Sequence, residues 1–320
     1  EVGELGLIAR LRRRLTTSRA LPKAGTVPGT LVGIGDDAAV LRLPVPSRTG
    51  RQTGGPGAGR RLLFASDMLV EGVHFLRRRV SAQAIGWKAL ACNVSDIAAM
   101  GGVPRWAVVS LGLPRATPVR FVDALYAGLE RCARRFGVAI VGGDTVRAPQ
   151  VVVDVAILGT VRPRDLALRS GVRVGDRLFV TGRLGGSYPS GRHARFLPRL
   201  AEAQALLRRV RVHAMIDLSD GLASDLWQLS RASGVALRVE AERVPVARAG
   251  RSVAHALMDG EDFELLFAVG AEEASRVPRR IGACPVTRIG SAVRRGAGVE
   301  LVRRDGRISP RAPRSFRHFK

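Results

Sequence analysis

The chain repeats one local pattern at four distant places: an apolar run, then small residues, then aspartate. The four copies are VGIGDD at 32–37, LLFASD at 62–67, VAIVGGD at 138–144 and MIDLSD at 215–220. Short apolar runs that end in small residues are typical of buried strands. Ligand sites in α/β proteins gather where strands end. The pattern therefore predicts an α/β protein in which several aspartates converge on one pocket.

These aspartates are conspicuous because the chain is otherwise strongly basic. Its 52 Lys and Arg face 27 Asp and Glu, which gives a net charge of +25 and a pI near 11.7. Such a charge is typical of nucleic-acid-binding proteins, and that function stays open as an alternative from a different class. However, aromatic residues make up only 5% of the chain, which leaves little surface for stacking bases. Nucleic-acid binding also leaves the recurring aspartates unexplained.

Several carboxylates with almost no histidine or cysteine nearby favour a hard divalent cation. Mg²⁺ takes oxygen ligands and is held through one or two carboxylates together with substrate phosphates. The five histidines are isolated and no C-x-x-C spacing occurs, which disfavours zinc. A fifth acid, Asp96, shares a helix face with Asn93, and Lys88 lies one or two turns behind. One such aspartate is as readily a turn or cap residue, but together they favour a metal–phosphate site.

The order of periodic segments predicts two α/β domains, residues 1–162 and 163–320. In the first we expect helices at 3–15, 81–101 and 118–136 and strands at 30–34, 38–43, 61–67, 105–114, 137–144 and 151–161. Residues 44–61 are rich in Gly, Pro and Arg and predict a loop. After a break at 162–176, further strand and helix segments begin at residue 177. The tail from residue 303 lacks a periodic pattern.

The chain is expected to be cytoplasmic and to have no membrane association. No run of eighteen apolar residues occurs, and residues 1–15 do not have the pattern of a signal peptide. The three cysteines are odd in number and far apart, which is typical of a reducing compartment.

Six motifs in order carry a family resemblance: GIGDDAAV, SDMLVEGVHF, GWKALACNVSDIAAMGGVPRW, VGGDTVRAP, IDLSDGLASDL and DGEDFELLF. Together they resemble the thiamine-monophosphate kinase family of the aminoimidazole ribonucleotide synthetase superfamily, whose members use ATP without a P-loop. Another ATP-using synthetase of that superfamily, or a hydrogenase-maturation relative, stays open, but neither accounts for DMLVEGVHF. Selenophosphate synthetase would need a reactive cysteine in an N-terminal glycine loop, and no cysteine precedes Cys92.

The resemblance implies a two-domain α/β (α+β) fold in which N-terminal strands form a barrel across a homodimer. It also implies phosphorylation of thiamine monophosphate to thiamine diphosphate, with ATP as co-substrate and several Mg²⁺ ions. The acceptor is already a phosphate anion, so direct in-line transfer needs no strong general base.

The resemblance also assigns residues. The implied metal ligands are Asp37, Ser66, Asp67, Asp96, Asp144, Asp217 and Asp220. ATP would contact Gly143, Asp144, Arg169 and Ser219. Thiamine monophosphate would contact His74, Glu261 and Phe316. The catalytic set would be Asp144, Asp220 and Arg169. Asp36 is a second candidate ligand, or it braces the turn that carries Asp37.

Two segments depart from the family pattern. Residues 182–199, GRLGGSYPSGRHARFLPR, are shorter than the family segment, and residues 48–61 form an extra Arg- and Gly-rich loop. The resemblance therefore does not predict the structure of residues 185–200.

Overall fold

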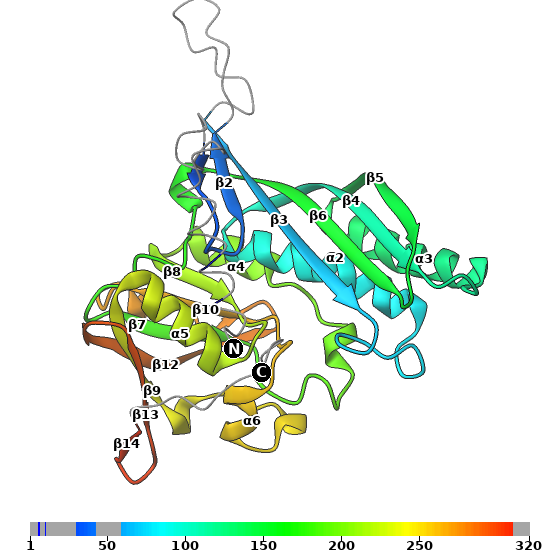
Figure 1. The fold of residues 1–320 in the computed structure, drawn as a ribbon. Coiled ribbons are helices and arrows are strands. Elements are labelled where there is room, and N and C mark those ends of the chain that lie inside the picture. The colour runs from blue at the N-terminus through cyan, green and yellow to red at the C-terminus, as the bar shows by residue number, and fades with distance from the viewer. Residues whose placement is uncertain (1–5, 7–9, 11–29, 43–58, 310–320) are drawn as a thin grey trace, which may run out of the picture.

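The structure is a computed structural model that describes residues 6, 10, 30–42 and 59–309. It contains two sheets, one built from residues 30–161 and the other from residues 177–309, each with its own helices (Figure 1). Among the described residues, no helix is long and apolar enough to cross a bilayer.

The first sheet has six strands in the order β1-β2-β3-β6-β4-β5. Its strands are β1 (Thr30–Val32), β2 (Ala39–Arg42), β3 (Arg61–Val70), β4 (Val103–Leu113), β5 (Ala139–Arg147) and β6 (Val152–Val161). All neighbours are antiparallel except β4 and β5, which are parallel. In β6, buried residues alternate with half-buried ones. This period of two shows that one face of the sheet is packed and the other is more open.

Two helices cover the packed face. Helix α2 (Ala82–Ala99) begins after Ser81, whose hydroxyl accepts from the Ala84 amide at 3.2 Å and caps the helix. Helix α3 (Val119–Phe136) is amphipathic and ends at Gly137 in the left-handed conformation. The two helices approach so closely that a Cβ added to Gly86 would lie 1.9 Å from the Leu125 carbonyl oxygen.

The second sheet has eight strands in the order β14-β13-β9-β12-β7-β10-β8, with β11 paired to β12. Its strands are β7 (Arg177–Thr181), β8 (Val212–Asp217), β9 (Val235–Glu240), β10 (Leu265–Val269), β11 (Arg280–Ile281), β12 (Cys284–Arg295), β13 (Gly298–Val302) and β14 (Ile308–Ser309). Helix α5 (Leu222–Ser233) packs on one face. Helix α4 (Leu200–Leu207) and the end of α2 pack on the other face. Helix α2 therefore belongs to the cores of both halves (Figure 1).

Most predicted strands and helices are present, with one correction that concerns the site. Asp67 lies inside β3 and Asp144 lies inside β5, so neither follows a strand end as the pattern predicted. Small residues before an aspartate are compatible with a continuing strand when the neighbouring strands supply hydrogen bonds. Helices α4 and α6 (Val253–Met258) and strands β13 and β14 have no counterpart among the predicted segments. Residues 44–58 of the predicted loop at 44–61 and most of the predicted helix at 3–15 lie outside the described residues.

Candidate active site

Three of the predicted aspartates meet at the junction of the two halves. Each of Asp37, Asp96 and Asp217 offers a carboxylate oxygen within 4.8 Å of the others. Asp37 lies in the turn between β1 and β2, Asp96 lies near the end of α2, and Asp217 is the last residue of β8. The Ser95 hydroxyl donates to Asp217 Oδ2 at 2.6 Å and orients that carboxylate. We call these three residues the acid cluster.

The acid cluster is electrostatically strained by burial and by mutual repulsion. Burial, followed by the charge of Asp37, raises the pKa of Asp217 to about 8. Burial, followed by Asp67 and Asp217, raises the pKa of Asp96 well above its ordinary value. Like charges in a poorly solvated site disfavour ionisation, so this arrangement favours either protons or a cation.

Two further aspartates, Asp67 and Asp225, have pKa values that are raised for the same reasons. Burial and then the charge of Asp220 raise the pKa of Asp67 to about 6. Asp225, which is fully buried on α5, also has a pKa well above the ordinary value, because of burial and then Asp220. The structure therefore brings five predicted metal ligands into one electrostatic neighbourhood: Asp37, Asp67, Asp96, Asp217 and Asp220.

Arg169 opposes this negative charge. Its NH2 group lies 2.5 Å from Asp37 Oδ1, and its NH1 group donates to Gln228 Oε1 at 2.5 Å. Gln228 in turn donates to Asp220 Oδ2 at 3.2 Å, so one polar chain links Arg169 to Asp220. Burial by itself would lower the pKa of Arg169, but the adjacent Asp37 carboxylate raises it, and the guanidinium stays charged.

Asp36 and Asp37 have different surroundings. The Asp36 carboxylate accepts from the Arg169 backbone amide at 3.1 Å and from the Asp37 amide at 3.1 Å. Asp37 instead offers a carboxylate oxygen within 4.8 Å of Asp96 and Asp217, and its buried Oδ2 has no hydrogen-bond partner among the described residues. This geometry favours Asp36 as the brace of the turn and Asp37 as the ligand.

The residues present fit a magnesium ion. The donor set is made of carboxylate oxygens, and the buried Oδ2 atom of Asp37 lacks a partner in the part of the chain that the structure describes. Carboxylate oxygens that converge in a buried site are the ligands that a hard divalent cation takes.

A second polar group lies around Lys88, whose side chain is fully buried in α2. Its Nζ donates to Glu261 Oε1 at 2.6 Å and to the His74 carbonyl oxygen at 2.9 Å. His193 Nδ1 lies 3.4 Å from the same Nζ and 3.3 Å from Glu261 Oε2. Two of the predicted substrate residues, His74 and Glu261, are thus brought together through a lysine.

The backbone around Glu261 is unusual. Glu261 has φ of 63° and Phe263 has φ of 49°, a left-handed region that L-residues rarely adopt. The Glu261 amide donates to the Ser219 carbonyl oxygen at 2.7 Å, which ties this segment to the loop after β8. Burial would raise the pKa of Glu261, but hydrogen bonds and charge from His193 and Lys88 outweigh it and lower that pKa. Glu261 is held as an anion in a strained loop, as is common at functional sites.

Two predicted metal ligands, Ser66 and Asp144, lie elsewhere in this chain. The Ser66 hydroxyl donates to Asp154 Oδ1 at 3.0 Å, which places both on the open face of the first sheet. Ser110 is in register with both Asp154 and Asp144, so Asp144 lies in the same row, and it is exposed. Within one chain, the thickness of the sheet therefore separates this row from the acid cluster.

The remaining predicted residue on β5 has a structural constraint of its own. A Cβ added to Gly143 would lie 1.8 Å from the Val109 carbonyl oxygen of the neighbouring strand. Gly143 is therefore needed for strand packing, whatever it binds.

Some residues of the site were not predicted, and one predicted residue lies outside the part of the chain that the structure describes. Phe316 lies outside the described residues. Asp225, His193 and Gln228 were given no role, and Lys88 was noted only as a neighbour of Asp96. Because Lys88 stands in the apolar run GWKALAC, the sequence indicates that its charge needs a buried partner. The sequence does not identify that partner. His193 belongs to the segment that departs from the family pattern.

Comparison with known proteins gives the class. A model of the N-terminal domain of AIR synthase related proteins matches residues 35–161, and a model of their C-terminal domain matches residues 180–302. The chain is therefore a two-domain protein of the AIR synthase related class, which confirms the predicted fold class.

Individual relatives identify the family within this class. Thiamine-monophosphate kinase of Rhodopirellula baltica is 40% identical over 91% of this chain and 90% of the relative. The Bacillus subtilis enzyme of that name is 32% identical over 90% of this chain and 94% of the relative. A solved structure of AaThiL complexed with AMPPCP and TMP has a TM-score of 0.80 at 29% identity and covers 99% of this chain and 97% of that one. The chain belongs to the thiamine-monophosphate kinase family, and the prediction of an enzyme is confirmed.

Proposed function

We propose that this chain transfers the γ-phosphoryl group of ATP to thiamine monophosphate and releases thiamine diphosphate. The observation that carries the proposal is the acid cluster, in which three carboxylates from distant elements converge within 4.8 Å beside an arginine. Family membership supports the substrates, because the relative AaThiL was solved with AMPPCP and TMP.

The proposed chemistry is positioning and charge neutralisation. Asp37, Asp67, Asp96, Asp217 and Asp220 would hold several Mg²⁺ ions, and bound Mg²⁺ would neutralise the phosphate charge that builds up during transfer. Arg169 now pairs with Asp37 beside the same site. When the Asp37 carboxylate binds the metal, the Arg169 guanidinium would be released to bind ATP phosphates. No general base is needed, since the acceptor oxygen belongs to a phosphate that is largely ionised near neutral pH.

The acceptor would lie on the Lys88 side of the site. Glu261, which is kept anionic by Lys88 and His193, would attract the cationic thiazolium of thiamine monophosphate, with His74 and Phe316 beside it. Ser219 lies two residues after Asp217 and would contact ATP. The family resemblance also assigns ATP contacts to Gly143 and Asp144. Donor and acceptor would then meet over the acid cluster.

We further propose that two copies pair through the open face of the first sheet. Its exposed apolar side chains include those of Phe64, Met68, Trp106 and Val108. An apolar face of this kind is typical of a protein interface. The barrel that the family resemblance implies would cover it and would bring the row with Ser66 and Asp144 against the second copy.

The pairing can be tested separately from activity. We expect light scattering of the wild-type protein to give twice the mass of one chain. The double variant Met68→Lys, Trp106→Lys should have the mass of one chain. A wild-type protein with the mass of one chain at micromolar concentration would contradict the pairing.

We also propose that the boundary between the two domains lies between residues 162 and 163, and that the protein is located in the cytoplasm.

The activity is tested by incubating the protein with ATP and thiamine monophosphate, with Mg²⁺ or with EDTA, and measuring thiamine diphosphate by chromatography. We expect the product only with Mg²⁺ and in a one-to-one ratio with ADP. If ADP forms at the same rate without thiamine monophosphate and no thiamine diphosphate is found, the proposal is wrong.

A further inference from the structure

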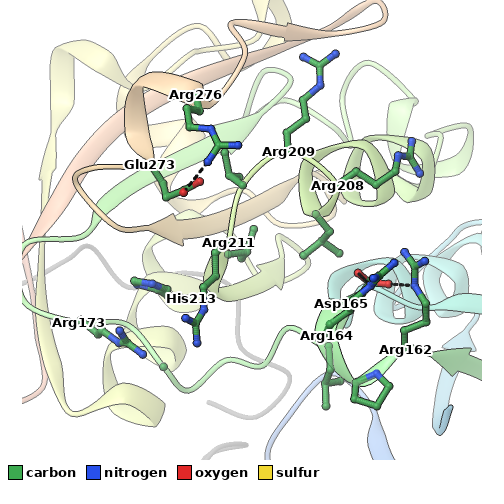
Figure 2. Close-up of a pocket in the computed structure, with 16 residues that line it drawn as sticks. Arg162, Arg164, Asp165, Arg173, Arg208, Arg209, Arg211, His213, Glu273 and Arg276 are labelled. Carbon is green, nitrogen blue, oxygen red and sulfur yellow. Dashed lines mark hydrogen bonds and ion pairs between the residues drawn. The ribbon is translucent and has the colours of Figure 1, made fainter. Parts of the chain in front are cut away.

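A basic pocket lies away from the acid cluster, and the proposed reaction does not use it. Its volume is about 840 Å³, and Figure 2 shows side chains from separate segments of the chain around one hollow. The lining includes seven arginines and one histidine against two carboxylates, Asp165 and Glu273. It combines the connection between the two halves, the segment between α4 and β8, and the short helix at 274–276.

Among the residues that the structure describes, four of these arginines have no carboxylate partner. Arg162 and Arg164 pair with Asp165, and Arg276 pairs with Glu273 at 2.8 Å. Arg173, Arg208, Arg209 and Arg211 form no ion pair with any residue in the part of the chain that the structure describes. His213 is already paired with Asp176 at 2.9 Å. The pocket therefore gathers uncompensated positive charge from two segments, the connection between the halves and the segment between α4 and β8.

The pocket is separate from the acid cluster. Val212 and His213, which line it, begin strand β8, and Asp217 of the acid cluster ends the same strand. At roughly 3.3 Å per residue, the two ends of this strand are about 16 Å apart. The signs of charge at the two ends are also opposite, so the two sites select different ligands.

We propose that this pocket is a second binding site, for a small anion that carries two or more phosphate groups. Planar guanidinium groups bind phosphate oxygens in pairs, and arginines on separate segments require a ligand with several anionic groups. The volume is within the range of small-molecule sites. No Phe, Tyr or Trp lines the pocket, so it offers no stacking platform for a nucleic-acid base. The phosphates come either from a nucleotide or from an inorganic or thiamine diphosphate.

The test measures binding without activity and without metal. Calorimetry with inorganic tripolyphosphate in EDTA and about 150 mM salt isolates the basic pocket, because the acid cluster repels phosphate when no cation is present. The double variant Arg173→Glu, Arg211→Glu removes two unpaired pocket arginines. The control variant Arg115→Glu, Arg120→Glu makes the same change in net charge at exposed positions outside the pocket. Circular dichroism checks that both variants are folded.

We expect tripolyphosphate to bind the wild-type and the control protein with the same affinity, within about twofold. The pocket variant should bind it at least about tenfold more weakly. Competition with ATP and with thiamine diphosphate then distinguishes the two sources of phosphate. Three results would overturn the proposal: no binding to the wild type at millimolar tripolyphosphate, an equal loss in both variants, or displacement by a short single-stranded RNA at a lower concentration than by ATP.

Discussion

At the scale of single residues, Lys88 is a charged group held by several buried contacts. Its side chain is fully buried, and its ammonium group contacts the Glu261 carboxylate at 2.6 Å and the His74 carbonyl at 2.9 Å. A buried charge is tolerated only when it is paired and hydrogen-bonded. Removal of one member of a buried pair costs more than removal of both, because the remaining charge is left uncompensated.

Replacement of Lys88 by Met should therefore destabilise the protein by about 3 kcal/mol, at the lower end of the usual range because Glu261 is partly exposed and keeps His193 nearby. The double variant Lys88→Met, Glu261→Gln should recover part of that loss. Urea unfolding measures both. Arg120→Met, which removes a charge from an exposed position, should change stability by less than about 0.5 kcal/mol. A double variant as unstable as the sum of the single variants would show that the pair is not coupled.

Sequence reasoning reached part of this site and missed the rest for a physical reason. The recurring pattern in a basic chain pointed to Asp37, Asp96 was noted beside it as a fifth acid, and the family resemblance assigned Asp217. The partners of Lys88 are 14, 105 and 173 residues away along the chain, so no local pattern contains them. His193 also lies in the shortened segment, where the family pattern gives no guide.

At the scale of elements, the close pairing of α2 with α3 sets the position of Asp96. The helices meet at two glycines. A Cβ on Gly86 would lie 1.9 Å from the Leu125 carbonyl oxygen, and one on Gly128 would lie 1.9 Å from the Gln83 carbonyl oxygen. Because both obstacles are backbone atoms, no side-chain rotation relieves them.

We expect Gly86→Ala to force the helices apart and to lower the free energy of unfolding by about 1–3 kcal/mol, although alanine favours helix more than glycine does. Thermal and urea denaturation measure this. Gly142→Ala is the matched comparison, since the nearest atom to its added Cβ is Val108 Cγ1 at 3.8 Å, and it should be nearly neutral. A Gly86→Ala protein more stable than wild type would mean that helix propensity outweighs packing here.

Element boundaries were predictable where a cap or a period marks them. Ser81 marks the start of α2, and alternation marks β6. The strand-end interpretation failed for Asp67 and Asp144 because GGD and ASD permit a turn without requiring one, and neighbouring strands continue the hydrogen bonding. Sheet order and the shared row of Ser66, Asp154 and Asp144 depend on pairing across the fold, which one sequence does not contain.

At the scale of the whole molecule, the acid cluster joins the two halves of the chain. Asp37 and Asp96 come from the first half, and Asp217 comes from the second. Without a cation, ionisation of the cluster pushes the halves apart, and a bound cation should draw them together. The free energy of unfolding should therefore fall when pH rises and should increase when Mg²⁺ is added.

The direction in which the free energy of unfolding changes with pH follows from the raised pKa values. Asp67, Asp36 and Asp217 have pKa values raised to about 6, 7 and 8, above the ordinary 3.8. The folded state therefore holds protons that the unfolded state has released. In EDTA, we expect the free energy of unfolding to fall as pH rises from about 5 to 8. Saturating Mg²⁺ should reverse this fall, because the metal binds the ionised carboxylates. Scanning calorimetry at several pH values measures both, and metal-free stability that rises over this interval would contradict the assignment.

The central claim is that the acid cluster holds the cation that phosphoryl transfer requires. The most direct test compares thiamine diphosphate formation by wild type, Asp96→Asn and Asp123→Asn at the same Mg²⁺, ATP and thiamine monophosphate concentrations. Asp123 is an exposed aspartate on α3 and serves as the matched control. We predict that Asp96→Asn lowers kcat by at least about 10³-fold while the protein stays folded, and that Asp123→Asn matches wild type. Turnover of Asp96→Asn within about tenfold of wild type would contradict the claim.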